Sequence, residues 1–286
     1  MKIAIVGFGN MGQTYASSFV SSGFIKSDDI FVLTRDLSKV SNKYTIPDTN
    51  FFTEISASFL SVDIVIVAVK PQDFSNLCLQ IKDFITEDHL ILSVMAGVSI
   101  DNISKKLQVK KIIRSMPNIP TQIGQGMTVF TASQEVDRKD LFIIQNLINT
   151  TGKSLFLENE EMINSSTAIS GSGPAYVYYF MNAIIDSAIN LGFTKSEAEF
   201  LVQQTFLGSI QLQNRSNLSN LEWIEKVASK GGTTEAALGI FHSYDLKSKI
   251  NEGIIQANAR AIELGKLIDK QKRTPNNGYK QLGQKC

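Results

Sequence analysis

The sequence of 286 residues predicts an α/β protein, with a doubly wound, mostly parallel sheet followed by an all-helical C-terminal domain. Short apolar runs alternate with helical stretches through the first half, and these runs are continuous, as in strands buried on both faces. After about residue 160 the strand pattern stops and apolar residues recur at helical spacing. We therefore expect a sheet domain over residues 1–160, a helical domain over 161–270 and a mobile polar tail over 271–286.

The sheet domain is predicted strand by strand from its short apolar runs. We expect strands at residues 2–6, 30–34, 63–69, 89–94, 111–115, 126–132 and 153–157. Helices are expected between them at residues 11–22, 36–43, 73–84, 100–107 and 134–149. Strand–helix–strand repetition of this kind favours right-handed crossovers that place helices on both faces of a parallel sheet.

The helical half carries broad apolar faces. We expect helices at residues 175–191, 196–213 and 246–269, and the first has Val177, Phe180, Met181 and Ile184 along one stripe. About 110 residues of helix with such faces need a partner surface. We interpret part of that surface as a subunit interface, and the alternative is an internal bundle that needs no partner.

Charge and residue content exclude several classes of function. Lys and Arg number 28 against 27 Asp and Glu, so no general electrostatic attraction to nucleic acid or to an anionic membrane is expected. No apolar run is long enough for a membrane span or a signal peptide. Two cysteines, Cys78 and Cys286, exclude a disulfide scaffold and a cysteine-based zinc site, which favours a reducing cytoplasm. No metal site is expected, because His89 and His242 lie in neither ligand nor triad spacing and are interpreted as structural.

A glycine turn follows the first predicted strand directly and opens the first predicted helix. It matches G-x-G-x-x-G and reads Gly7-Phe8-Gly9-Asn10-Met11-Gly12. Gly7 permits the tight turn, Gly9 lets a pyrophosphate approach the backbone, and Gly12 allows close helix–strand packing. The helix start offers unpaired N–H groups to phosphates. In this context the motif predicts a Rossmann-type dinucleotide site, and the alternative is a turn that only connects two elements.

The end of the second predicted strand bears on which dinucleotide is bound. It reads Thr34-Arg35-Asp36, whereas NAD sites usually place Asp or Glu there to bind the ribose hydroxyls. A short hydroxyl and a guanidinium suit a 2′-phosphate, so we favour NADPH. Asp36 lies slightly late for the acidic role, which keeps NADH possible, and Arg35 has the alternative of a solvated surface residue.

Three further loops follow strand ends, where open parallel sheets bind their ligands. Lys70 in the first loop suits either a phosphate contact or a surface charge, and Asn118 in the third could reach the nicotinamide or the substrate. The loops read Ala68-Val69-Lys70-Pro71, Met95-Ala96-Gly97-Val98 and Met116-Pro117-Asn118-Ile119-Pro120.

Two segments are unusual for a helical domain, because each gathers small residues just before a helix. They read Ser170-Gly171-Ser172-Gly173-Pro174-Ala175-Tyr176 and Ser229-Lys230-Gly231-Gly232-Thr233-Thr234-Glu235-Ala236-Ala237-Leu238. The free N–H groups and dipole at the second helix start suit a carboxylate. Pro174 suits the first turn of the helix after the first segment, and the local sequence alone favours helix capping for both.

The chain resembles the pyrroline-5-carboxylate reductase family over residues 1 to about 268. The glycine turn, the three loops and the two helix starts carry this resemblance, and they occur in the family's order. One departure is Lys230, where many members have proline, and the tail after residue 270 has no counterpart in the family.

The resemblance implies NAD(P)H-dependent reduction of the cyclic imine 1-pyrroline-5-carboxylate to L-proline, the last step of proline biosynthesis. It implies that Thr234 lies at the imine nitrogen as the catalytic residue, and that the N–H groups of Gly232, Thr233 and Thr234 bind the substrate carboxylate. Asn118 and Ser172 are weaker candidates for the pocket. It also implies that residues 1–160 bind the dinucleotide and that residues 161–270 bind substrate and form a homodimer or a higher, dimer-based oligomer.

Two other functions are weighed against this one. A related hydroxyacid-type dehydrogenase would place a catalytic lysine on the helix after the glycine-rich segment, and residues 174–185 contain none. A non-catalytic NADPH-binding protein would be expected to lose the Gly-Gly-Thr-Thr segment, which is intact.

Overall fold

The computed structural model describes residues 1–40, 46–55, 59 and 61–270. Contacts along the chain group it into two compact units, of which the first joins Met1–Gly171 to the chain from Asn258 onward, and the second is Ser172–Ala257. The boundary between Ala257 and Asn258 falls inside the last helix, α10 (Leu246–Lys270). The domain limits expected from the sequence stay a prediction, and the expected tail at residues 271–286 lies outside the described residues.

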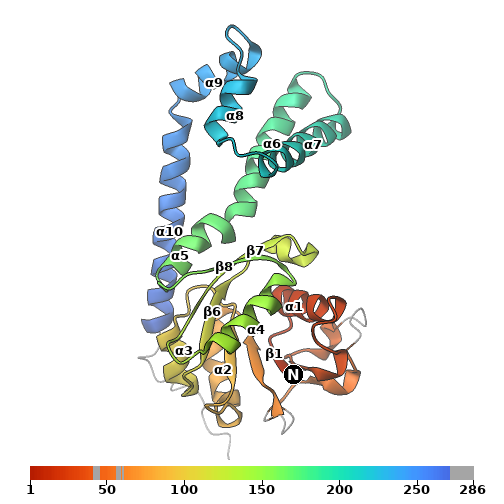
Figure 1. Ribbon diagram of the computed structural model, residues 1–286, viewed down its shortest axis with the longest axis vertical. Helices are drawn as coiled ribbons and strands as arrows, with labels where there is room; N and C mark the ends of the chain where they lie inside the picture. The colour runs from red at the N-terminus through yellow and green to blue at the C-terminus, as the bar shows by residue number, and fades with distance from the viewer. Residues whose placement is uncertain (41–45, 56–58, 60, 271–286) are drawn as a thin grey trace, which may run out of the picture. The chain divides into compact units, whose positions relative to one another are not determined.

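The first unit is built on one sheet, which has eight strands among the described residues (Figure 1). Every neighbouring pair is parallel except β6 and β7, which confirms the mostly parallel, doubly wound fold. The strand order is β3-β2-β1-β4-β5-β6-β7-β8. The bounds are β1 Ile3–Val6, β2 Ile30–Leu33, β3 Phe51–Phe52, β4 Ile64–Val67, β5 Leu90–Ser93, β6 Ile112–Met116, β7 Gly126–Ala132 and β8 Gly152–Phe156.

Helices cover both faces of this sheet because successive strand residues point to opposite sides. Ile3 and Ile5 of β1 pack with α1 (Asn10–Ser21) and α4 (Arg138–Asn149) in one buried cluster. Ala4 and Val6 of the same strand pack with α2 (Phe74–Ile81) and α3 (Ile100–Leu107) in another. β1 lies between β2 and β4, so β2 and β3 continue the sheet on one side of β1 and β4 and the later strands continue it on the other. A crevice is expected where the order reverses, at the carboxyl ends of β1, β2 and β4.

Two predicted helices of the first unit differ in the structure. Instead of a helix over residues 36–43 there is a short 3₁₀ turn, η2 (Leu37–Lys39), and residues 41–43 lie outside the described residues. Asp36 is the N-cap residue of this turn, and its carboxylate accepts the Ser38 N–H. The helix expected to begin at residue 134 begins at Arg138, because the Asp137 carboxylate caps it by accepting the Asp140 N–H.

Short elements connect the others in the first unit. The strand β3 was not predicted, because its two residues are too few to form an apolar run. Further 3₁₀ turns in the described part of the unit are η1 (Ser27–Asp29), η3 (Asp48–Asn50), η5 (Pro71–Asp73), η6 (Lys82–Phe84) and η7 (Ile119–Ile123). The first of the unit's two chain segments, Met1–Gly171, ends with α5 (Met162–Ser166) and a π-helical turn, η8 (Thr167–Gly171).

The second unit is entirely helical. Its helices are α6 (Gly173–Asn190), α7 (Lys195–Asn214), α8 (Asn220–Val227), α9 (Thr233–Ser243) and the first half of α10. Two of them begin with a capping box, in which Thr194 pairs with Glu197 and Ser219 with Glu222. The helical C-terminal region expected from the sequence is thus confirmed, with α8 as an addition.

The second unit buries little of its apolar surface. All of residues 172–257 are described, and among their apolar side chains only Ala198 and Val202 are buried. Large side chains such as Leu191, Tyr179 and Phe200 are 81%, 74% and 70% exposed. Despite this apolar character, none of the helices in the described part of the chain is both long and apolar enough to cross a membrane.

Candidate dinucleotide and substrate site

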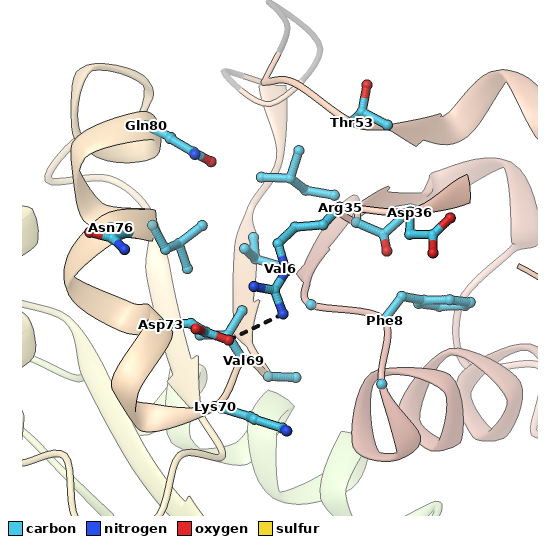
Figure 2. Close-up of a pocket in the computed structure, with 16 residues that line it drawn as sticks. Val6, Phe8, Arg35, Asp36, Thr53, Val69, Lys70, Asp73, Asn76 and Gln80 are labelled. Atoms are coloured by element: carbon cyan, nitrogen blue, oxygen red, sulfur yellow. Dashed lines mark ion pairs between the residues drawn. The ribbon is translucent and has the colours of Figure 1, made fainter. Parts of the chain in front are cut away.

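A cavity of about 560 Å³ opens at the carboxyl ends of β1, β2 and β4 (Figure 2). This is the switch point of the sheet, where the chain leaves the central strand to both sides. Backbone bonds tie its rim together, since the Gly7 N–H donates to the Leu33 carbonyl at 2.9 Å and the Ala68 N–H donates to the Val6 carbonyl at 2.8 Å. The lining residues are Val6, Gly7, Phe8, Gly9, Leu33, Thr34, Arg35, Asp36, Thr53, Ala68, Val69, Lys70, Asp73, Asn76, Leu77 and Gln80.

The glycine turn forms one wall of this cavity, and two of its glycines are required by packing. Gly7 has φ +95°, and a Cβ there would lie 2.8 Å from the Ala68 carbonyl. A Cβ on Gly12 would lie 2.1 Å from the Gly7 oxygen, because α1 starts directly against the turn. No other residue fits either position without moving the backbone, as the sequence motif predicts.

Gly9 differs from its two neighbours, because no atom lies within 4 Å of the Cβ it lacks. The residue is exposed at the rim of the cavity and caps α1, whose first N–H groups have no intrahelical partner. A side chain there would fill the space beside these groups and would touch nothing in the protein. The missing Cβ therefore leaves room for a ligand, and a dinucleotide pyrophosphate fits such a cradle.

Among the described residues, four charged side chains line the cavity, namely Arg35, Asp36, Lys70 and Asp73. The Arg35 guanidinium extends across the opening to Asp73, with 3.2 Å between Nη2 and Oδ2 (Figure 2). Asp36 also lines the cavity, and its Oδ1 accepts the Ser38 N–H at 3.0 Å and the Ser38 hydroxyl at 2.6 Å. The carboxylate considered for the ribose hydroxyls of NADH and the guanidinium considered for a 2′-phosphate thus both line the cavity, and the carboxylate also caps η2.

The cavity includes some of the predicted cofactor residues and adds others. Those that line it are Gly7, Phe8, Gly9, Thr34, Arg35, Ala68, Val69 and Lys70, whereas Asn10, Met11, Gly12, Pro71, Met95, Ala96 and Gly97 are outside its lining. The lining residues that sequence reasoning missed are mainly Asp73, Asn76, Leu77 and Gln80. These four recur at helical spacing from the end of η5 through α2, after the predicted Ala68–Pro71 loop, and that position was the available signal.

Two other predicted loops have defined places in the first unit. The Met95–Gly97 loop follows β5, with Met95 buried and Gly97 at φ +75°. A Cβ on Gly265 of α10 would lie 3.1 Å from the Gly97 oxygen, so the helix packs closely on this loop. Asn118 donates to the Ser170 carbonyl at 3.0 Å and accepts the Met127 N–H at 2.9 Å. Its amide therefore holds η8 against β7, and its predicted role toward nicotinamide or substrate stays untested.

The Gly-Gly-Thr-Thr segment forms the start of α9 in the second unit. Gly232 is the N-cap residue, and no side chain provides a cap hydrogen bond there. Instead the Glu235 carboxylate accepts the N–H of Gly231, which has φ +73°, at 2.7 Å. The two threonines therefore do not serve as the N-cap, which was the alternative interpretation of this segment.

The backbone N–H groups of this helix start are not equivalent. The Gly232 N–H donates to the Ser229 carbonyl at 3.0 Å, so this predicted donor is used within its own turn. Thr233 and Thr234 are the first two helical residues, and their N–H groups have no intrahelical acceptor by position. Ser172, the other predicted residue of the second unit, precedes α6 as its N-cap residue, with Pro174 in the first turn.

His89 and Cys78 are both buried in the first unit. The His89 Nδ1 accepts the Thr86 N–H at 2.9 Å, which leaves Nε2 to donate to the Phe59 carbonyl at 3.3 Å. Burial raises the pKa of the Cys78 thiol to about 11, so it is not a thiolate at neutral pH. Among the residues that the structure describes, no group of three or more His, Cys, Asp or Glu is placed to hold a metal ion.

Both halves of the chain match known protein families. Residues 160–264 match the model for pyrroline-5-carboxylate reductase dimerisation. Residues 2–97 match the model described as NADP oxidoreductase coenzyme F420-dependent. These two matches cover the second unit and, in the first, the whole glycine turn and all of the cavity-lining residues.

Individual relatives match along nearly the whole chain. A pyrroline-5-carboxylate reductase of Staphylococcus epidermidis is 31% identical over 94% of this chain and all of its own length. The solved structure of a pyrroline-5-carboxylate reductase from Coxiella burnetii superposes with a TM-score of 0.83 and 30% identity, and the match covers 92% of this chain and 98% of that one. A pyrroline carboxylate reductase of Plasmodium falciparum, solved with NADP bound, shares the fold at TM-score 0.83 and 24% identity over 93% and 98% of the two chains.

Proposed function

The chain belongs to the pyrroline-5-carboxylate reductase family, and we propose that it reduces 1-pyrroline-5-carboxylate to L-proline with NADPH. The observation that carries this proposal is the end-to-end match, which spans 94% of the chain and includes both the glycine turn and the Gly-Gly-Thr-Thr helix start. The hydroxyacid-type dehydrogenase and the non-catalytic alternative have no observation in their favour.

The first unit binds the nucleotide. Bound there, NADPH supplies a hydride to the imine carbon of the substrate. The first N–H groups of α1 and the open space at Gly9 hold the pyrophosphate, with Gly7 and Gly12 fixing the turn. Arg35 faces the cavity and pairs with a 2′-phosphate, which favours NADPH over NADH. Asp36 lines the cavity as well, but its Oδ1 already accepts the Ser38 N–H and hydroxyl, which supports this preference.

The second unit binds the substrate. The N–H groups of Thr233 and Thr234, at the positive end of α9, bind its carboxylate. The Thr234 hydroxyl donates a hydrogen bond to the imine nitrogen, which becomes the amine of proline when it takes up a proton. A threonine hydroxyl does not titrate near neutral pH, so Thr234 orients and polarises the imine and is not its general base.

The exposed helices of the second unit pair with a second copy of the chain. Residues 160–264 match a family model described as a dimerisation region, and the apolar side chains of this region are largely exposed in the single chain. Contiguous apolar surface of this kind marks a protein–protein interface. We therefore place the protein in a homodimer or a dimer-based oligomer. The reducing cytoplasm expected from its two cysteines stays a prediction.

The proposal is tested by following NADPH absorbance in the purified protein with and without 1-pyrroline-5-carboxylate. We expect oxidation of NADPH only when the imine is present, with one L-proline formed per NADPH consumed. A parallel assay with a 2-keto acid in place of the imine serves as the control for dehydrogenase activity. Absence of proline, or equal oxidation with the keto acid, would remove the proposed function.

A further inference from the structure

An ion pair joins two side chains that line the nucleotide cavity. Arg35 follows β2 on one side, Asp73 lies just before α2 on the other, and their charged atoms are 3.2 Å apart (Figure 2). Both side chains line the cavity, and the Arg35 side chain is 84% exposed. A ligand group that reaches Arg35 therefore meets a guanidinium that already has a carboxylate partner.

The Asp73 carboxylate has no other task in the described structure. Asp73 occupies the N-cap position of α2, where an acidic side chain commonly accepts a helix N–H, but it makes no cap hydrogen bond. Its backbone N–H donates to the Lys70 carbonyl, which needs no side chain. Among the described residues the carboxylate is thus directed at Arg35.

We propose that Asp73 limits the selectivity of the cavity for NADPH over NADH, because its carboxylate pairs with the Arg35 guanidinium until a 2′-phosphate displaces it. This inference rests on the proposed use of NADPH and names the residue that limits the preference for it. A phosphate with two negative charges and three acceptor oxygens pairs with a guanidinium through two parallel hydrogen bonds. The partly buried Asp73 carboxylate makes one contact with the exposed Arg35 guanidinium, so the phosphate prevails, but its net gain is reduced by the contact it replaces.

A nucleotide without the 2′-phosphate has no anionic group there that could replace the Asp73 carboxylate at Arg35. Its ribose hydroxyls are neutral, and Arg35 keeps Asp73 as its partner. Asp73 therefore lowers the affinity for NADPH and leaves that for NADH unchanged, so the cavity is less selective than Arg35 alone would make it. Replacing Asp73 by a neutral residue of the same shape should increase the selectivity.

The experiment measures binding by calorimetry on the full chain, with 2′,5′-ADP as the phosphorylated probe and 5′-AMP as the unphosphorylated one. We expect Asp73→Asn to tighten 2′,5′-ADP by about two- to fivefold, the range that an exposed ion pair permits, and to leave 5′-AMP unchanged. Arg35→Gln should weaken 2′,5′-ADP by about tenfold or more, and in that background Asp73→Asn should have little effect.

A matched control is Asp101→Asn, which removes another carboxylate that forms an exposed ion pair in the first turn of a helix, here with Lys105. It changes the net charge equally and should not alter binding of either probe. Unchanged or weaker 2′,5′-ADP binding in Asp73→Asn would overturn the proposal. An equal gain in the Arg35→Gln background would also overturn it, since the effect would then not pass through Arg35.

This binding test is independent of turnover. If the wild-type protein reduces the imine but Asp73→Asn binds as the wild type does, the proposed function stands and the role of Asp73 fails. If the binding pattern is as expected but no imine is reduced, the selectivity device stands and the proposed function fails. Melting temperatures of all variants show whether each is folded, and Asp73→Ser is a second neutral replacement if Asp73→Asn is not.

Discussion

The two units differ in how they are stabilised. In the first, strands such as β1 and β4 are buried along their whole length, and two apolar clusters fill the space between sheet and helices. In the second, only Ala198 and Val202 are buried among the apolar side chains of residues 172–257, all of which are described. The first unit therefore contains its own core, whereas the second presents the apolar surface from which a core would be built.

This difference indicates that the first unit keeps a rigid cavity, whereas the second provides a surface for assembly. A closed core holds the glycine turn rigidly. The turn needs this rigidity because the backbone packs so closely at Gly7 and Gly12 that neither position has room for a Cβ atom. An open apolar surface has to be covered, and a second copy of the chain is the partner that the family match supports. Stability of the substrate-binding helices should then depend on assembly, and that of the cavity should not.

The largest effect is expected from placing a charge on the exposed face of the second unit. Phe200 of α7 is 70% exposed, and Phe200→Glu would bury an unpaired carboxylate in the proposed interface. We expect the dimer to weaken by about 10²-fold or more, as for other interface hot spots, in sedimentation equilibrium. The control is Phe142→Glu on α4 of the first unit, 68% exposed, which should leave assembly unchanged. Equal dissociation by both variants, or by neither, would contradict the comparison.

The next effect is expected at the glycine turn of the first unit. In Gly12→Ala the added carbon meets the Gly7 oxygen at 2.1 Å, so the turn must shift, with a cost of about 1–3 kcal/mol in stability. In Gly9→Ala the added carbon meets no protein atom. We expect Gly12→Ala to lower both melting temperature and NADP⁺ affinity, and Gly9→Ala to lower only the affinity, by about tenfold for a loss of 1.4 kcal/mol. Unchanged NADP⁺ affinity in Gly9→Ala would exclude this turn as the phosphate cradle.

The smallest effect concerns a helix start in the second unit, where local caps support helices that have little core. In the α7 capping box the Thr194 hydroxyl and N–H hold the pKa of Glu197 below its usual value. Because the folded-state pKa is lowered, the stabilisation is complete above the unfolded-state pKa and is lost as pH falls through the folded one. We expect Glu197→Gln to lower the melting temperature at pH 7, with the difference shrinking below about pH 4.

Glu199→Gln on the same helix provides the control for this cap. Glu199 forms an exposed pair with Lys195 and does not cap the helix, so its replacement should change the melting temperature less. A deficit of Glu197→Gln that is constant from pH 7 to pH 3 would show that the cap does not depend on the carboxylate charge.

The sequence predicted the centre of the sheet well because β1, β4 and β5 are short, mostly apolar runs that are buried along their whole length. It missed β3, whose two residues pair with β2 only through the folded sheet, and it extended the helix after β2 where the Asp36–Ser38 contact makes a short turn. It also missed α8, an eight-residue helix set between two polar turns. Tertiary pairing and local capping decide these elements, and neither produces a periodic pattern.

Part of the cavity lining was predictable where a motif has its own geometry. Gly7 and Gly9 follow from a local turn, and Arg35 follows from its place after a strand. The Arg35–Asp73 pair did not, because it joins residues 38 positions apart that meet only when β2 and α2 are placed on the same sheet. The two bonds of the Asn118 amide, to Ser170 and Met127, were hidden for the same reason.

The central claim is that the first unit holds the nucleotide while Thr234 of the second acts on the imine. It is tested most directly by comparing Thr234→Ala with Thr234→Ser in two measurements, namely turnover of 1-pyrroline-5-carboxylate and the dissociation constant for NADP⁺. We predict that Thr234→Ala loses about 10²-fold in kcat, as when one transition-state donor is removed, that Thr234→Ser keeps most of it, and that neither changes NADP⁺ binding. Unaltered turnover in Thr234→Ala, or an equal loss of NADP⁺ affinity, would contradict the account.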